Sequence, residues 1–214
     1  QPIIYYNTTS IHGDADINQA CISVNACDGA LVTCNTMKGN DASPNSMKGF
    51  ECNVSDNSYI GCNGSDSTGI GFFFGGICLY TQMLGDSMNN HDVGLYLNNV
   101  AVIDTQTHAG NKWIGTYGSG YGAVNMNDST FQNLRKSLFV VDLSLGSTYF
   151  PSTPTSSPNN VGWFEDTVGT PFSCYSGTCI VARDEDGGGG SDELRMSIVQ
   201  DNTITSDFIP ESKA

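Results

Sequence analysis

The residues best suited to chemistry in this sequence are its eight cysteines. None stands in a CxxC pair or a CxxCH motif, so the spacing argues against a zinc ribbon and a c-type haem site. An even number of cysteines without metal-ligand spacing is typical of disulfides made in an oxidising compartment. We therefore expect at least three disulfides. The cysteines are Cys21, Cys27, Cys34, Cys52, Cys62, Cys78, Cys174 and Cys179.

The sequence leaves the disulfide connectivity open, because eight cysteines allow many pairings. Cys174 and Cys179 enclose a short turn that contains glycine, which makes them a plausible local pair. Cys78 is the last of the six N-terminal cysteines, and we expect it to pair within that set.

Calcium is the cofactor with the best support. Asp14, Asp16 and Asn18 place side-chain oxygens at alternate positions, as the first ligands of a calcium-binding loop do. The stretch departs from an EF-hand, because Gln19 replaces the required glycine and Asn25 replaces the bidentate glutamate. The alternative is an Asx turn without a bound metal.

Motifs for catalysis are absent from the sequence. The nucleophile elbow GxSxG does not occur. His91 or His108 can still belong to a triad, because the chain order of triad members is not fixed. Glu165 and Asp166 supply carboxylates, but the sequence brings no two acids to a defined separation. We therefore predict that the chain is not an enzyme and has no catalytic residues.

Composition points to an extracellular or cell-surface protein. The net charge is -14, which argues against nucleic acid and anionic membranes as partners. Charged residues make up only 14% of the chain, so Asn, Ser, Thr and Gly must supply much of the polar surface. No apolar run is long enough to span a membrane. Four Asn-x-Ser/Thr sequons are possible glycan acceptors. They begin at Asn7, Asn53, Asn63 and Asn127.

The strand pattern predicts an all-β domain. Short apolar or alternating segments such as 1–11, 17–24, 30–33 and 70–80 are separated by turn residues, with almost no helical periodicity. We expect an antiparallel β sandwich with Greek-key-like connections. The predicted domain covers residues 1–186, with a disulfide-rich excursion at 35–68.

The tail predicts a strand on a flexible tether. Residues 187–191 are four glycines and a serine, which behave as a flexible linker. Residues 192–214 then alternate apolar and polar side chains, as an extended C-terminal strand does. Its apolar positions are Leu194, Met196, Ile198, Ile204 and Phe208.

Two functions follow from these features. The leading hypothesis is a structural, self-assembling extracellular subunit, with a filament or pilus-like assembly linked by strand exchange between neighbours. The alternative is a secreted carbohydrate-binding or adhesin module whose tail packs on its own domain. Aromatic side chains in turns can stack on sugar rings, although core packing is their more common role. These are Trp113, Tyr117, Tyr121, Trp163 and Phe164.

Overall fold

The computed structural model places most of the chain. It describes residues 2–5, 7–10, 19–39, 47–98, 100–127, 135–151, 155–156, 162–174, 198–200 and 203–205. The chain divides into two compact units, residues 1–173 and 174–214.

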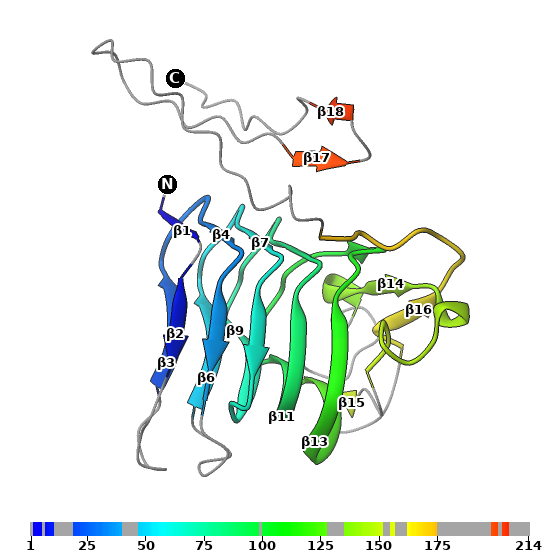
Figure 1. Ribbon diagram of the computed structural model, residues 1–214, viewed down its shortest axis with the longest axis horizontal. Coiled ribbons are helices and arrows are strands. Elements are labelled where there is room, and N and C mark those ends of the chain that lie inside the picture. The colour runs from blue at the N-terminus through cyan, green and yellow to red at the C-terminus, as the bar shows by residue number, and fades with distance from the viewer. Residues whose placement is uncertain are drawn as a thin grey trace. The chain divides into compact units, whose positions relative to one another are not determined.

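The first unit repeats a group of three strands along the chain (Figure 1). Each group forms one turn of the chain, which we call a coil. The first coil has β1 (Ile3–Tyr5), β2 (Thr8–Ser10) and β3 (Gln19–Asn25). The second has β4 (Leu31–Thr33), β5 (Thr36–Lys38) and β6 (Met47–Asn53). The third has β7 (Tyr59–Gly61), β8 (Gly64–Asp66) and β9 (Ile70–Gly75). The fourth has β10 (Gln82–Leu84) and the long β11 (Ser87–Leu97), which continues two rows at once.

Each strand pairs in parallel with its counterpart one coil further on. One row has the order β1-β4-β7-β10, and a second sheet runs β2-β5-β8-β11-β9-β6-β3. Ile3, Leu31, Tyr59 and Gln82 lie in register, so successive coils advance by 28, 28 and 23 residues. Stacked coils in which each repeat pairs with its neighbours form a parallel β-solenoid.

The later part of the first unit continues the stack. β13 (Lys112–Asn125) pairs with β11 and with β15 (Thr155–Ser156). β12 (Gln106–Thr107), β14 (Phe139–Val141) and β16 (Phe164–Asp166) form a separate parallel sheet. Two short 3-10 helices, η1 (Arg135–Ser137) and η2 (Leu143–Leu145), flank β14.

The predicted antiparallel β sandwich is wrong, because all strand pairs of the first unit are parallel. Short alternating strands with turn residues between them are common to both architectures. Parallel neighbours need a long crossover, which usually contains a helix. Here the other strands of the same coil make that crossover. A sequence without helical periodicity can therefore still form parallel sheets, which is why the predicted antiparallel class was wrong. Residues 35–68, predicted as an excursion, contain β5 to β8.

The core is built from ladders of side chains that point into the solenoid. Ile22, Phe50, Phe72 and Leu95 occupy matching positions of four successive coils. All four are buried, and the Phe50 and Phe72 ring centroids lie 5.7 Å apart. Because the coils stack with aligned residues, Phe50 and Phe72 each lie between counterparts in the two neighbouring coils.

A ladder of Asn and Asp side chains runs along one corner of the coils. Asn35 Oδ1 accepts from the backbone N–H of Asn7 at 3.0 Å, and Asn63 Oδ1 accepts from that of Asn35 at 3.0 Å. Asp86 Oδ1 accepts from the Asn63 N–H at 2.8 Å, and Asn111 Oδ1 accepts from the Asp86 N–H at 3.0 Å. Buried polar groups need such partners, so the ladder fixes the register of the stack.

The residue before each ladder position from the second coil onward has a positive φ. These residues are Cys34 (59°), Cys62 (57°), Gly85 (70°) and Gly110 (67°). Glycine adopts this conformation without strain. At Gly110 a Cβ atom would also collide with the Phe172 carbonyl oxygen.

A disulfide is present, as predicted. Cys34 and Cys62 are disulfide-bonded, and both directly precede ladder asparagines in adjacent coils. The Cys34 N–H donates to the Gly61 carbonyl at 3.1 Å, which places the two cysteines side by side. Strands of neighbouring coils are about 4.8 Å apart, a separation that a disulfide spans. Cys27, Cys52 and Cys78 are thiols. Cys174 is also disulfide-bonded, and its predicted partner Cys179 lies outside the described residues. Three disulfides stay a prediction.

The described residues of the second unit form one antiparallel strand pair. β17 (Ile198–Gln200) pairs with β18 (Thr203–Thr205), with Val199 opposite Ile204. Ile198 and Ile204, predicted to lie in one extended strand, belong to these two strands. The other predicted assembly residues, Leu194, Met196 and Phe208, lie outside the described residues.

Candidate functional site at the edge of the first coil

Among the described residues, the strands of the first coil lie at one end of the stack. Within the described residues β1 pairs only with β4, β2 only with β5 and β3 only with β6. Each strand therefore turns one side of its backbone away from the stack. We call these three strands the first-coil edge (Figure 1).

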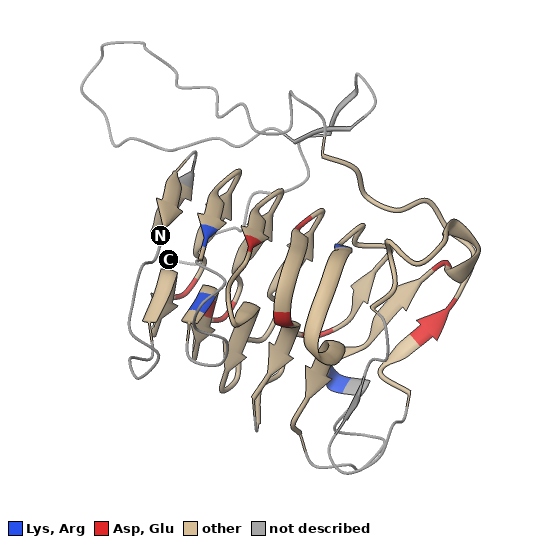
Figure 2. Cartoon of the chain, turned by 60° about the horizontal axis from the view of Figure 1, so that its bottom comes forward, with Lys and Arg blue, Asp and Glu red and all other residues tan. Residues whose placement is uncertain are grey.

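The first-coil edge carries no charged residue and no proline. Its strand sequences are IIY, TTS and QACISVN. Figure 2 shows these strands in tan, without the blue or red of charged residues, although acidic residues are common in the chain. Natural sheets usually protect an edge with lysine, proline, a bulge or a covering segment. Uncharged, β-branched edge strands instead provide a template on which another strand can pair.

The comparisons with known proteins add no relative. No family model, no curated protein and no solved structure matches this chain. The function must therefore be argued from the residues alone. Among the residues that the structure places, no helix is long and apolar enough to cross a membrane.

The predicted calcium ligands lie outside the described residues. Asp14, Asp16 and Asn18 fall in the stretch 11–18. Elsewhere, within the placed part of the chain, no three His, Cys, Asp or Glu side chains are grouped closely enough to hold a metal ion. A calcium site at Asp14 to Asn18 stays a prediction.

The four sequon asparagines differ in exposure. Asn7 is exposed and Asn53 is half-buried. Asn63 and Asn127 are 1% and 5% exposed. The Asn63 amide belongs to the ladder, and the Asn127 amide donates to the Ala101 carbonyl at 2.6 Å. A glycan at either buried position requires that these amides leave the fold. Asn7 is the most exposed of the four, although its Nδ2 donates to the Asn35 Oδ1 at 3.1 Å.

His91 lies on β11, and its imidazole is only 3% exposed. Its Nδ1 lies 3.2 Å from the Thr68 backbone nitrogen and 3.0 Å from the Thr68 carbonyl oxygen, and its Nε2 lies 3.1 Å from both the Asn89 nitrogen and the Ser65 carbonyl oxygen. In the neutral ring one nitrogen therefore accepts from a backbone N–H and the other donates to a backbone carbonyl. Burial lowers the pKa of His91, so the neutral imidazole is favoured. Both ring nitrogens are occupied by backbone groups, and the histidine therefore holds a corner of the coil.

His108 lines a hollow that is open to solvent, together with Trp113, Phe139 and Asp142. Asp142 accepts from the Ser144 N–H at 2.9 Å and from the Gly169 N–H at 3.2 Å. Hydrogen bonds from Ser144 and Gly169, and the charge of His108, lower the pKa of Asp142. Both carboxylate oxygens have partners, so Asp142 holds the chain after β14. It is poorly placed to act as a general base.

A row of four residues, two of them aromatic, lies on the outward face of β3, β6, β9 and β11. We call it the aromatic row. Ser23, Glu51, Phe73 and Tyr96 are in register on four successive coils. The Phe73 and Tyr96 rings are stacked, with centroids 5.7 Å apart and planes 10° apart. Their neighbours Phe72 and Phe74 point inward and are fully buried.

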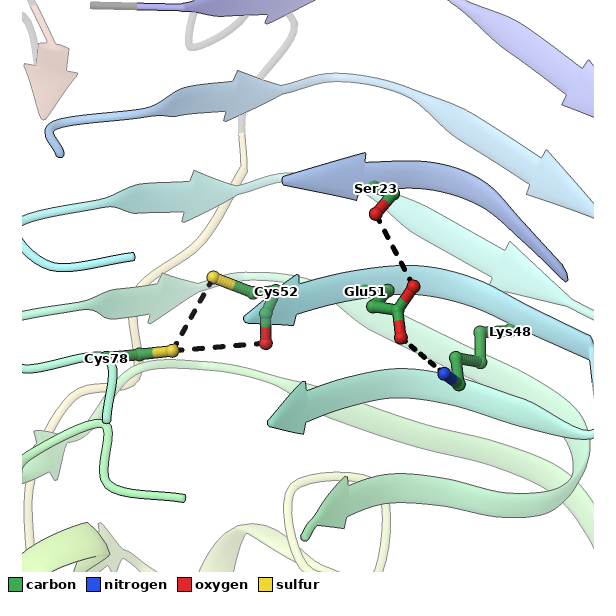
Figure 3. Close-up of polar contacts among 5 residues, drawn as sticks. All are labelled: Ser23, Lys48, Glu51, Cys52 and Cys78. Carbon is green, nitrogen blue, oxygen red and sulfur yellow. Dashed lines mark hydrogen bonds and ion pairs between the residues drawn. The ribbon is translucent and has the colours of Figure 1, made fainter. Parts of the chain in front are cut away.

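A charged pair adjoins this row (Figure 3). Lys48 forms an ion pair with Glu51, and its Nζ lies 3.9 Å from the centre of the Phe73 ring. Burial alone raises the pKa of Glu51, but hydrogen bonds from Lys48, Asn53 and Ser23 outweigh that effect and lower it. The row thus combines two stacked rings with a fixed pair of charges.

The aromatic residues that the sequence suggested for stacking are mostly used in the core. Trp113 and Trp163 are 5% and 2% exposed. Phe164 and Tyr117 pack against the core, and only Tyr121 is well exposed, at 42%. Phe73 and Tyr96 were missed because alternation alone does not say which aromatic faces outward.

Proposed function

We propose that this chain is a structural, self-assembling extracellular subunit whose first-coil edge pairs with a strand from a neighbouring copy. The observation that carries this proposal is the absence of charge and proline from all three edge strands. Backbone hydrogen bonds made along such an edge add up over its length. The uncharged surface also removes the repulsion that two chains of net charge -14 would otherwise feel at the contact.

The C-terminal segment of the neighbouring copy is the proposed donor. Its tether of five residues, 187–191, reaches at most about 18 Å, and β17 and β18 follow it. A contact between the tail of one copy and the edge of the next is heterologous. Heterologous contacts that do not close into a ring generate filaments.

Lysines on the edge should abolish assembly. In the double variant Thr8→Lys/Ser10→Lys, two exposed side chains of β2 become charges on the pairing surface, which opposes strand addition. We expect the parent to form filaments in electron micrographs and the variant to elute as a monomer on size exclusion with light scattering. Val54→Lys is the matched control, because Val54 is 63% exposed outside the edge strands.

Deletion of residues 187–214 identifies the donor. If the tail donates the strand, the truncated chain is monomeric, and a peptide of residues 192–214 binds it but not the Thr8→Lys/Ser10→Lys variant. Filaments that persist in the edge variant contradict the proposal. A parent that forms only closed dimers also contradicts it, because two identical edges that pair head to head close the assembly.

The aromatic row supports a second candidate function, the binding of neutral glycans. Two aromatic rings on the outward face lie one coil apart in a parallel sheet, and aromatic side chains on such a face can contact a sugar ring. Tyr96→Ala removes one of the two aromatic rings of the row. We expect it to weaken the binding of a neutral hexasaccharide such as cellohexaose about threefold to tenfold in titration calorimetry.

Tyr80→Ala is the control for this experiment, because Tyr80 is 69% exposed and lies outside the row. Equal affinity of the parent and of Tyr96→Ala, or no binding of cellohexaose and maltohexaose to the parent, removes the glycan candidate. The edge proposal is independent of this result.

A further inference from the structure

Two buried thiols meet between adjacent coils. Cys52 is the sixth residue of β6, and Cys78 follows the corner after β9. Both side chains are 0% exposed, and their sulfur atoms lie 3.8 Å apart (Figure 3). They are 26 residues apart in sequence, close to the length of one coil.

The two thiols face each other and a few neighbouring polar groups. The carbonyl oxygens of Cys52 and Gly75 lie 3.9 Å from the Cys78 sulfur, and Ser55 adjoins both cysteines. The contact with the Cys78 thiol and burial both raise the pKa of Cys52, whereas the contact with Cys52 lowers the pKa of Cys78, so Cys78 is the better thiolate of the pair. Neither thiol belongs to a metal-binding group within the described residues.

The corner brings the two cysteines together. Gly75 faces the Asn53 side chain and leaves no room for a Cβ atom there. Gly76 has a φ of 75°, which turns the backbone so that Cys78 returns over Cys52. Two thiols in contact need only a small side-chain movement to reach bonding distance.

We propose that Cys52 and Cys78 are joined by a disulfide that forms during folding. One thiolate attacks a small-molecule disulfide such as oxidised glutathione and displaces one glutathione thiolate. The second cysteine then displaces the second glutathione, so the pair gives up two electrons and two protons and the glutathione disulfide becomes two thiols. The exchange precedes closure of the third coil, because both sulfurs are buried afterwards.

This bond adds to the disulfide bonding of Cys34 and Cys62. Those two cysteines link the second and third coils at the corner just before the ladder. The Cys52–Cys78 bond links the second coil to the end of the third at a different corner. Disulfide bonds thereby link the second and third coils, which contain the polar middle of the chain, at two corners.

Peptide mapping tests the assignment on the full chain folded in a glutathione redox buffer and alkylated without reduction. The chain has no Lys or Arg between Lys48 and Lys112, so trypsin leaves Cys52, Cys62 and Cys78 in one peptide. Cleavage before Asp56, Asp66 and Asp86 separates them. We expect a linked pair of peptides, 41–55 with 66–85, that dissociates on reduction.

Thermal unfolding supplies the second measurement. Cys78→Ala should lower the Tm by about 5 to 10 °C in oxidising buffer and by much less in reducing buffer. Cys27→Ala is the control and should leave the linked peptide in place. Full alkylation of Cys52 and Cys78 in the unreduced parent overturns the proposal, and so does a link from Cys52 to Cys27.

Discussion

Asn63→Ala is expected to lower the free energy of unfolding by about 3 to 5 kcal/mol. The Asn63 side chain is 1% exposed and lies in the middle of the ladder. Its Oδ1 accepts from the N–H and the Nδ2 of Asn35, at 3.0 Å and 2.9 Å. Its Nδ2 donates to the Val32 carbonyl and to Asp86. Alanine leaves each of these buried groups without its partner, and the penalty of an unsatisfied buried group is paid at several positions.

Urea unfolding followed by circular dichroism measures this loss. The control is Asn98→Ala, which removes the same amide from an exposed position after β11. We expect the control to change the free energy of unfolding by less than about 0.5 kcal/mol. A similar effect of the two substitutions would mean that the ladder does not determine the stability of the stack.

Several features of the fold could be predicted from local sequence. Alternating apolar residues gave strands close to their observed places, such as the predicted strand 30–33 against β4 (Leu31–Thr33). The same alternation places Phe72 and Phe74 on one face. The even cysteine count indicated disulfides, and Cys34 and Cys62 are disulfide-bonded. These signals depend only on a few neighbouring residues.

The stacking of coils could not be predicted in the same way. Its signal is a dipeptide at the corner, Cys or Gly followed by Asn or Asp, at residues 34–35, 62–63, 85–86 and 110–111. The ladder positions are separated by 28, 23 and 25 residues, and so uneven a period is hard to distinguish from chance. The similar sequences Thr36–Gly39 and Ser46–Gly49 do not mark successive coils, because Met37 and Met47 belong to different strands of one coil, β5 and β6.

The candidate site was hidden for a related reason. The sequence indicates that residues 1–11 form a strand, but whether a strand lies at an edge depends on its partners. Pairing partners are set by the stacking order and not by local composition. The outward position of Phe73 and Tyr96 likewise follows from the register of β9 and β11. Once the order of coils is known, both features can be read from the sequence.

The only acid in the described ladder is Asp86, which has a distinct environment. Its Oδ1 accepts from Asn63, but its Oδ2 is buried and has no hydrogen-bond partner among the described residues. At the equivalent positions the Nδ2 of Asn63 donates to Val32 and the Nδ2 of Asn111 donates to Met83. Val32 and Met83 are both in register with Ile60, so the Ile60 carbonyl is the expected acceptor at Asp86. A carboxylate cannot donate to it.

Burial raises the pKa of Asp86 well above its ordinary value, against the effect of the Asn63 hydrogen bonds. A raised pKa in the folded state means that the folded chain binds the proton more tightly than the unfolded chain. The contribution of Asp86 to stability is therefore fully present below the unfolded pKa, near 4, and is lost as the pH rises through the folded pKa. The neighbouring titratable group is Tyr59, whose pKa is raised by burial and by Asp86, so it stays neutral in this range.

Asp86→Asn should consequently stabilise the chain, by about 1 to 3 kcal/mol at pH 8, because the new amide donates to the Ile60 carbonyl and no buried carboxylate remains. The advantage over the parent should shrink as the pH falls towards 4. Destabilisation at low pH from the buried neutral His91 is common to both chains and cancels in the difference. Urea unfolding at pH 5, 6, 7 and 8 measures this, with Asp92→Asn on β11 as a control for the same change in net charge. A variant that is less stable than the parent at pH 8, or whose advantage does not change with pH, would show that Asp86 is well accommodated as a carboxylate.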